Sequence, residues 1–261
     1  MTGAGAVAGV VLLEWSAGWI GTAAWTQSWS VVRRGHFRIV GWCVLVLTAL
    51  VVALFNSDGT GIDAAARTSV LVFGCGALLY LLVQYSRTDV PGVVVGATAA
   101  IAGALALTLT AGDMQGWPQA LAALELVAGA VLLGAVTNGM LLGHWYLNQP
   151  GLKPWALARL TQLALAGTAA TAVLGLVATG RLINASTAGS VLGLEGFGES
   201  FGAIFYGAWV VLLAFTGAVV WGAKRCVSMR SIQSATGLYY VALLTAGVSE
   251  FVVRYLMVNA T

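Results

Sequence analysis

The chain has 261 residues, of which 59% are hydrophobic and only 8% are charged. Soluble domains carry charge on roughly a quarter of their residues, so this composition excludes a water-soluble protein and indicates an integral membrane protein. The net charge of +3 is spread over short loops and gives no reason to expect nucleic acid as a partner. Three widely separated cysteines likewise give no reason to expect a metal or iron–sulfur site on this chain.

Eight segments are apolar and long enough to cross a bilayer, for which about 20 residues are needed. The predicted spans cover residues 6–27, 38–55, 68–86, 92–111, 118–146, 154–179, 201–222 and 236–257. Ordinary turn residues separate them, for example in Gln149-Pro150-Gly151. We therefore predict an all-α, polytopic integral protein of the cell membrane with eight transmembrane helices in contact with the lipid bilayer.

The basic residues predict the orientation of these spans. Nine of the twelve Lys and Arg residues fall on one side: Arg33, Arg34, Arg38, Arg87, Lys153, Arg159, Lys224, Arg225 and Arg230. Loops rich in Lys and Arg stay in the cytoplasm, so this side is predicted to be the inner one. With eight spans, both termini then lie outside.

Two spans carry similar short sequences that match at four of six positions, which suggests an internal repeat. One reads Leu13-Glu14-Trp15-Ser16-Ala17-Gly18 and the other Leu124-Glu125-Leu126-Val127-Ala128-Gly129, with the two glutamates 111 residues apart. Duplication would divide the chain into four-helix halves, 1–115 and 116–261, running in the same direction within one membrane domain. A chance match in a chain rich in Ala, Gly and Leu is the other interpretation.

Glu14 and Glu125 are the first candidate functional residues, because an ionisable side chain inside the hydrocarbon usually faces the bundle interior and carries function. Both spans enter from outside, which places the two carboxyl groups in the outer half. Glu250 lies at the same level in the last span, four residues before Arg254, at a spacing that allows a pair. The carboxyl groups are predicted to handle protons or a polar ligand. The alternative is that each stabilises a separate helix contact.

A second candidate site lies near the inner boundary of the fifth span, at Asn138, His144, Trp145 and Tyr146. A quinone head group could stack on an aromatic ring while the imidazole or phenol binds a carbonyl oxygen and exchanges protons. Trp and Tyr also belong to the ordinary interfacial belt, so their presence has a structural explanation as well.

His36 and His144 are the two histidines of the chain, and a twofold arrangement of the halves could make them paired axial ligands of a b-type haem. His36 stands between Arg34 and Arg38, however, a context that predicts a solvated turn facing lipid phosphates. No span has a lysine near its middle, which disfavours a retinal Schiff base.

Eight helices in two groups of four, outward termini and a carboxylate in the first helix of each half resemble the NrfD/DmsC/PsrC family. Its members are quinone-reacting membrane anchor subunits of oxidoreductase complexes. The resemblance implies that the chain binds quinone, carries no redox centre of its own and contacts an iron–sulfur or cytochrome subunit. Glu14 and Glu125 would then handle protons. The resemblance places the quinone on the outer side, whereas the site around His144 is on the inner side.

Three functions follow from these features. The first is a membrane anchor subunit of a respiratory electron-transfer complex, possessing a quinone site and handling protons through Glu14, Glu125 and His144. The second is a small proton-coupled transporter or channel that uses the same carboxylates. The third is a structural or assembly subunit in which the polar side chains only join helices.

Overall fold

The structure is a computed structural model that describes residues 1–57, 59–86, 88–185 and 200–259. Within these ranges every regular element is a helix, and eight helices are long and apolar enough to cross a membrane, which confirms the predicted all-α polytopic fold. The elements in chain order are α1 (Ala4–Gln27), α2 (Gly35–Phe55), α3 (Ala64–Val83), α4 (Val90–Gly112), α5 (Gln119–Asn148), α6 (Trp155–Val177), α7 (Thr179–Ile183), α9 (Phe201–Ser228) and α10 (Ile232–Asn259).

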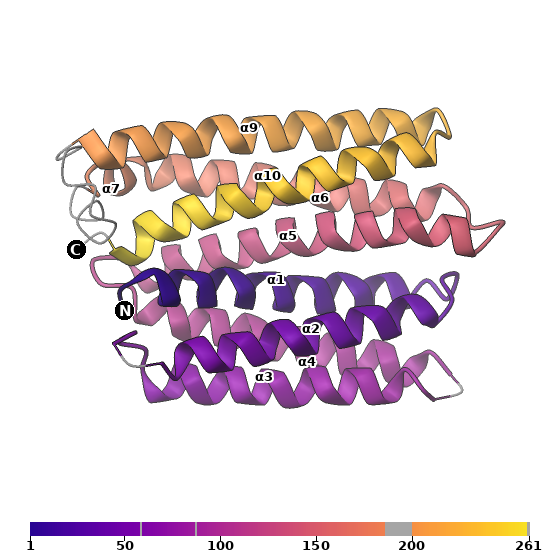
Figure 1. The fold of residues 1–261 in the computed structure, drawn as a ribbon, viewed down its shortest axis with the longest axis horizontal. Helices are drawn as coiled ribbons and strands as arrows, with labels where there is room; N and C mark the ends of the chain where they lie inside the picture. Colours follow the sequence, from indigo (N-terminus) through magenta and orange to yellow (C-terminus); the bar gives the residue numbers. More distant parts are fainter. Residues whose placement is uncertain (58, 87, 186–199, 260–261) are drawn as a thin grey trace.

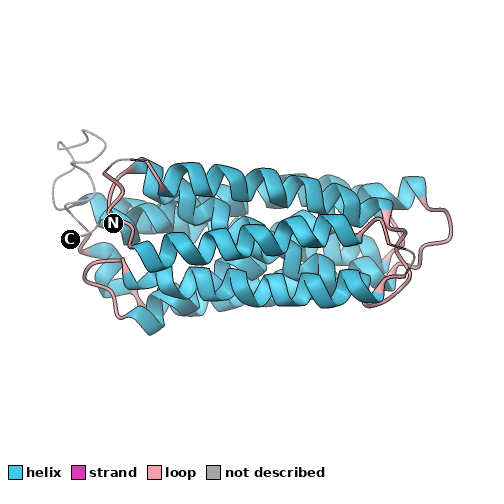
Figure 2. Ribbon diagram, turned by 90° about the horizontal axis from the view of Figure 1, so that it is seen from below, coloured by secondary structure: helices cyan, strands magenta, loops and turns pink. Residues whose placement is uncertain are grey.

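The eight long helices run along a common axis, and the start of α1 and the end of α10 lie at the same end of the bundle (Figure 1). Helices α1 to α4 lie on one side, and α5, α6, α9 and α10 on the other. The connections gather at the two ends (Figure 2). The predicted boundary between residues 115 and 116 falls in the connection between α4 and α5. Arg87, one of the basic residues behind the predicted orientation, lies outside the described residues.

Helices α1 and α5 are the most deeply buried of the eight and pack against each other along the middle of the bundle. Glycine permits this close approach. A Cβ atom on Gly18 would overlap the backbone carbonyl of Ala130, and one on Gly134 would overlap the backbone of Gly18. Small residues bring transmembrane helices together in this way, so that van der Waals packing joins the two backbones.

The outer faces of the bundle carry large apolar side chains, as contact with lipid requires. Val46, Leu71, Ile101 and Leu244 are all at least half exposed on four different helices. A soluble protein would not present so much apolar surface to water. These faces therefore contact the lipid bilayer.

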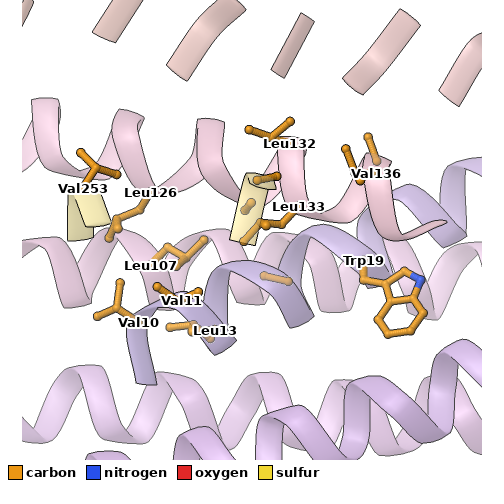
Figure 3. Close-up of a cluster of buried hydrophobic side chains, with 14 of the residues drawn as sticks. Val10, Val11, Leu13, Trp19, Leu107, Leu126, Leu132, Leu133, Val136 and Val253 are labelled. Atoms are coloured by element: carbon orange, nitrogen blue, oxygen red, sulfur yellow. The ribbon is translucent and has the colours of Figure 1, made fainter. Parts of the chain in front are cut away.

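The interior is an apolar core that surrounds the ionisable residues. Leu13, Leu126 and Val253 are fully buried members of that core (Figure 3). Each is the chain neighbour of a buried charged side chain. Each of these apolar neighbours helps to keep water away from the charged group beside it.

Several helices extend beyond the predicted spans. Helix α9 continues six residues past the predicted end at 222, and α10 begins four residues before 236. The apolar segment of the sequence predicts only the part of a helix that lies in the hydrocarbon layer. The helix itself can continue beyond that layer, as α9 does through Lys224 and Arg225, because their long side chains reach the polar boundary.

Candidate functional site

Four ionisable side chains from three helices meet in the interior. Arg254 of α10 donates from Nε to Glu14 Oε1 of α1 at 2.8 Å and from Nη2 to Glu250 Oε2, one turn earlier on α10, at 2.8 Å. Its Nη1 lies 3.6 Å from Glu125 Oε2 of α5, and its Nη2 donates to the Glu125 backbone carbonyl at 2.7 Å. The i,i+4 pair predicted for Glu250 and Arg254 is confirmed. We call these four residues the carboxylate cluster.

The carboxylate cluster is closed to solvent and contains more acidic groups than basic groups. All four side chains are fully buried, and three carboxyl groups share a single guanidinium group. Among the described residues, four carboxyl oxygens have no hydrogen-bond partner: Glu14 Oε2, Glu250 Oε1 and both side-chain oxygens of Glu125. A buried carboxylate without a partner is strongly unfavourable. The arrangement is therefore suited to groups that take up and release protons.

Gly129 provides the space for the cluster. A Cβ atom at this position would lie 2.6 Å from Glu250 Oε2, 2.7 Å from Arg254 Nη2 and 2.8 Å from Glu14 Oε1. Gly18, its counterpart in the repeated sequence, contacts backbone of α5 instead. The two glycines of the repeat thus have different functions in packing.

Replacing Gly129 with alanine should push the guanidinium and carboxyl groups apart and lower the free energy of unfolding by about 1–3 kcal/mol. Unfolding of the purified protein in detergent measures this change. Gly247→Ala on α10 is the matched control, because nothing lies within 4 Å of its added methyl group. Equal stability of both variants would show that the cluster has room to relax.

His144 and Tyr146 lie in a second site, a groove between α5 and α10. His144 Nε2 is 3.0 Å from the Tyr240 hydroxyl, and the two rings meet edge to face. The groove has a volume of about 500 Å³ and is lined by Gly143, His144, Tyr146, Leu147, Ile232, Gln233, Thr236, Gly237 and Tyr240. We call it the His144 groove.

Gln233, Thr236 and Tyr240 line this groove from α10 and were not predicted from the sequence, because they lie about 90 residues from His144.

The structure does not bring Asn138 and Trp145 into this groove. Asn138 donates to Thr26 Oγ1 and accepts from His36 Nε2, both at 2.9 Å. The Trp145 ring lies 5.8 Å from the His36 ring. Asn138 and Trp145 are seven residues apart and so share a face of α5, whereas His144 is turned by about 100° from Trp145. The predicted inner site is thus divided between two faces of α5.

His36 is fully buried, which corrects the prediction of a solvated turn. The ring points toward α5, while its basic neighbours bind elsewhere: Arg34 pairs with Asp89 at 2.9 Å and Arg38 lies over the Tyr85 ring. His36 and His144 therefore face different partners, Asn138 and Tyr240 respectively. The described residues contain no group of three or more His, Cys, Asp or Glu side chains that could hold a metal ion.

Two further buried polar contacts were not anticipated. Gln27 of α1 donates to Gln84, just after α3, at 2.8 Å, and Trp15 donates to Thr137 at 2.8 Å. The sequence offered a signal for the Gln27–Gln84 contact, since Gln27 ends one predicted span and Gln84 lies near the end of another. Gln near a helix end is also ordinary at a membrane interface, however.

No protein-family model, curated protein or solved structure matches the chain. The geometry of the cluster and of the groove is therefore the basis for assigning a function.

Proposed function

We propose that the chain is a quinone-reacting membrane subunit of an electron-transfer complex, in which the carboxylate cluster holds protons. One observation carries the proposal: Glu14, Glu125 and Glu250 surround the single guanidinium group of Arg254 in a fully buried site. An intramembrane ionisable group that faces a bundle interior is typical of proton relays.

The charge of the cluster indicates how many protons it holds. With every group ionised, three carboxylates and one guanidinium would leave two negative charges in an apolar interior. Because an uncompensated buried charge is so costly, two protons complete the neutral cluster. Reduction of a quinone to a quinol consumes two electrons and two protons, so the cluster has a matching capacity.

The His144 groove has the chemistry that a quinone head group requires. The Tyr240 and Tyr146 rings provide flat apolar surfaces, and the His144 imidazole can donate to a quinone carbonyl oxygen. In this proposal the electrons pass between the quinone and a partner subunit that carries an iron–sulfur or haem centre, as the resemblance to the anchor family implies.

The groove and the cluster are too far apart for direct proton exchange. His144 follows Glu125 by 19 residues on one helix, a separation of about 28 Å at 1.5 Å per residue. Two polar pairs join α1 and α5 between them: the partly buried pair Trp15–Thr137 and the buried pair Thr26–Asn138. We propose that protons cross this distance along intervening water, which the Thr137 and Thr26 hydroxyl groups can bind, whereas the Trp15 indole N–H only donates and orients Thr137.

Glu14→Gln and Glu125→Gln are each expected to lower quinol-linked turnover about 100-fold or more, the lower end of the effect of a proton-transferring side chain. Turnover is measured in membranes of cells that make the chain with its native partners, alongside the amount of folded complex. Asp113→Asn, the same chemical change in the loop after α4, is the control and should leave turnover unchanged. Normal turnover in both glutamine variants would rule out the proposed roles.

A small proton-coupled transporter is a second candidate, and one observation favours it. Glu14 and Glu125 belong to different halves of the bundle and reach the same guanidinium group, so a change of protonation alters the contact between the halves. Purified chain in proteoliposomes distinguishes the candidates. Proton-driven substrate uptake without any partner subunit would establish the transporter.

A further inference from the structure

At the end of the bundle opposite the termini, the loop after α1 is tied to the loop after α5. Gln149 forms this link: its Oε1 accepts from the Arg33 backbone N–H at 2.9 Å, and its Nε2 donates to the Val31 carbonyl at 2.7 Å. A cavity of about 300 Å³ lies here, lined by Val31, Gln149, Gly151, Leu152, Lys153 and Trp155. We call it the loop cavity.

Aromatic rings fix a cation beside this cavity. The Arg159 guanidinium lies 4.6 Å from the centre of the Trp155 ring and 5.5 Å from that of Trp29, and the two rings are 5.4 Å apart. Trp155 therefore borders the cavity and also holds Arg159 in place. Such an arrangement orders a guanidinium group while leaving its N–H donors free to bind an anion.

The positive charge here is not balanced by the protein. Within the described part of the chain, neither Lys153 nor Arg159 forms an ion pair with a carboxylate. Asp89, the acidic residue of the connection before α4 at this end, is already paired with Arg34 at 2.9 Å. The cavity therefore has one uncompensated cation in its lining, Lys153, and a second, Arg159, held against its Trp155 wall, together with amide and backbone polar groups and apolar ring surface.

We infer that the loop cavity binds the phosphate group of an anionic phospholipid, with Lys153 and Arg159 as the phosphate ligands. Basic pockets between transmembrane helices at the membrane surface recognise acidic lipid head groups in this way. Trp155 and Leu152 contact the glycerol and the first methylene groups. Because the cavity is built from the loops of both halves, the bound lipid also joins them.

The test measures retention of phosphatidylglycerol by protein purified in phosphatidylcholine nanodiscs, using native mass spectrometry and a lipid titration. The double variant Lys153→Gln/Arg159→Gln should bind phosphatidylglycerol about 30-fold more weakly, the loss expected for two basic contacts at a membrane surface. Both side chains are exposed, so the fold should persist. Wild-type affinity in this variant would overturn the inference.

Lys224→Gln/Arg225→Gln is the matched control, because it removes the same charge at the same end of the bundle. Arg225 also lies over a tryptophan ring, Trp221, at 4.7 Å, but neither basic residue lines the loop cavity. The control should retain wild-type affinity, and equal losses in both double variants would show general attraction to an anionic surface instead. Competition by inorganic phosphate alone would identify a free-anion site and also overturn the lipid assignment.

Discussion

Replacing Arg254 with methionine is expected to lower the free energy of unfolding by about 3–5 kcal/mol, because it leaves the one ionised carboxylate of the cluster buried without its counter-charge. Arg254 is fully buried and binds residues of α1 and α5 from α10. Its loss should therefore weaken contacts between three helices at once. Unfolding of the purified protein in detergent, followed by circular dichroism, measures the change.

The matched variant removes the acidic groups as well. Glu14→Gln, Glu125→Gln and Glu250→Gln combined with Arg254→Met make the site neutral, and neutral replacement of a buried ion cluster is often harmless to stability. This quadruple variant should recover most of the lost stability, although it should not support turnover. Wild-type stability of the single Arg254→Met variant would contradict the charge balance proposed for the cluster.

Replacing Gly18 with alanine is expected to prevent α1 and α5 from packing. The added methyl group would overlap the Ala130 backbone carbonyl, which cannot move aside as a side-chain terminus can. The loss should reach or exceed the upper end of the about 1–3 kcal/mol typical of overpacking. The yield of folded protein and its unfolding temperature measure the effect.

Gly5→Ala provides the control on the same helix. Nothing lies within 4 Å of a methyl group added at Gly5, and alanine favours helix over glycine by about 1 kcal/mol. This variant should be as stable as the wild type or slightly more stable. Wild-type stability of the Gly18→Ala variant would contradict the close contact of α1 and α5 at Gly18 and Ala130.

The sequence was sufficient to predict the spans and the level of the acidic residues, because both depend on hydropathy along the chain. It also predicted the Glu250–Arg254 pair, since one helical turn separates the two residues. It could not predict that Arg254 would bind Glu14, 240 residues away, or that Gly129 would leave room for the cluster. Those contacts depend on how each helix is rotated about its own axis, which near-uniform apolar sequence does not specify.

The histidines and Trp145 also show that helix rotation is hard to predict from sequence. His144 and Trp145 are adjacent in the sequence and were grouped for that reason, yet one residue turns a helix by about 100° and places them on different faces. The arginine neighbours of His36 in the sequence predict a solvated position for it. In the structure those arginines bind other groups, and the histidine alone faces Asn138.

The distance along the chain between Glu14 and Arg254 has a consequence for biosynthesis. A ribosome that adds roughly 5–20 residues per second takes roughly 12–48 seconds to travel those 240 residues. Throughout this interval the newly inserted first segment carries an acid whose cationic partner has not yet been synthesised. Until the last segment arrives, Glu14 has to be protonated or shielded from lipid, because an ionised carboxylate is costly in the hydrocarbon.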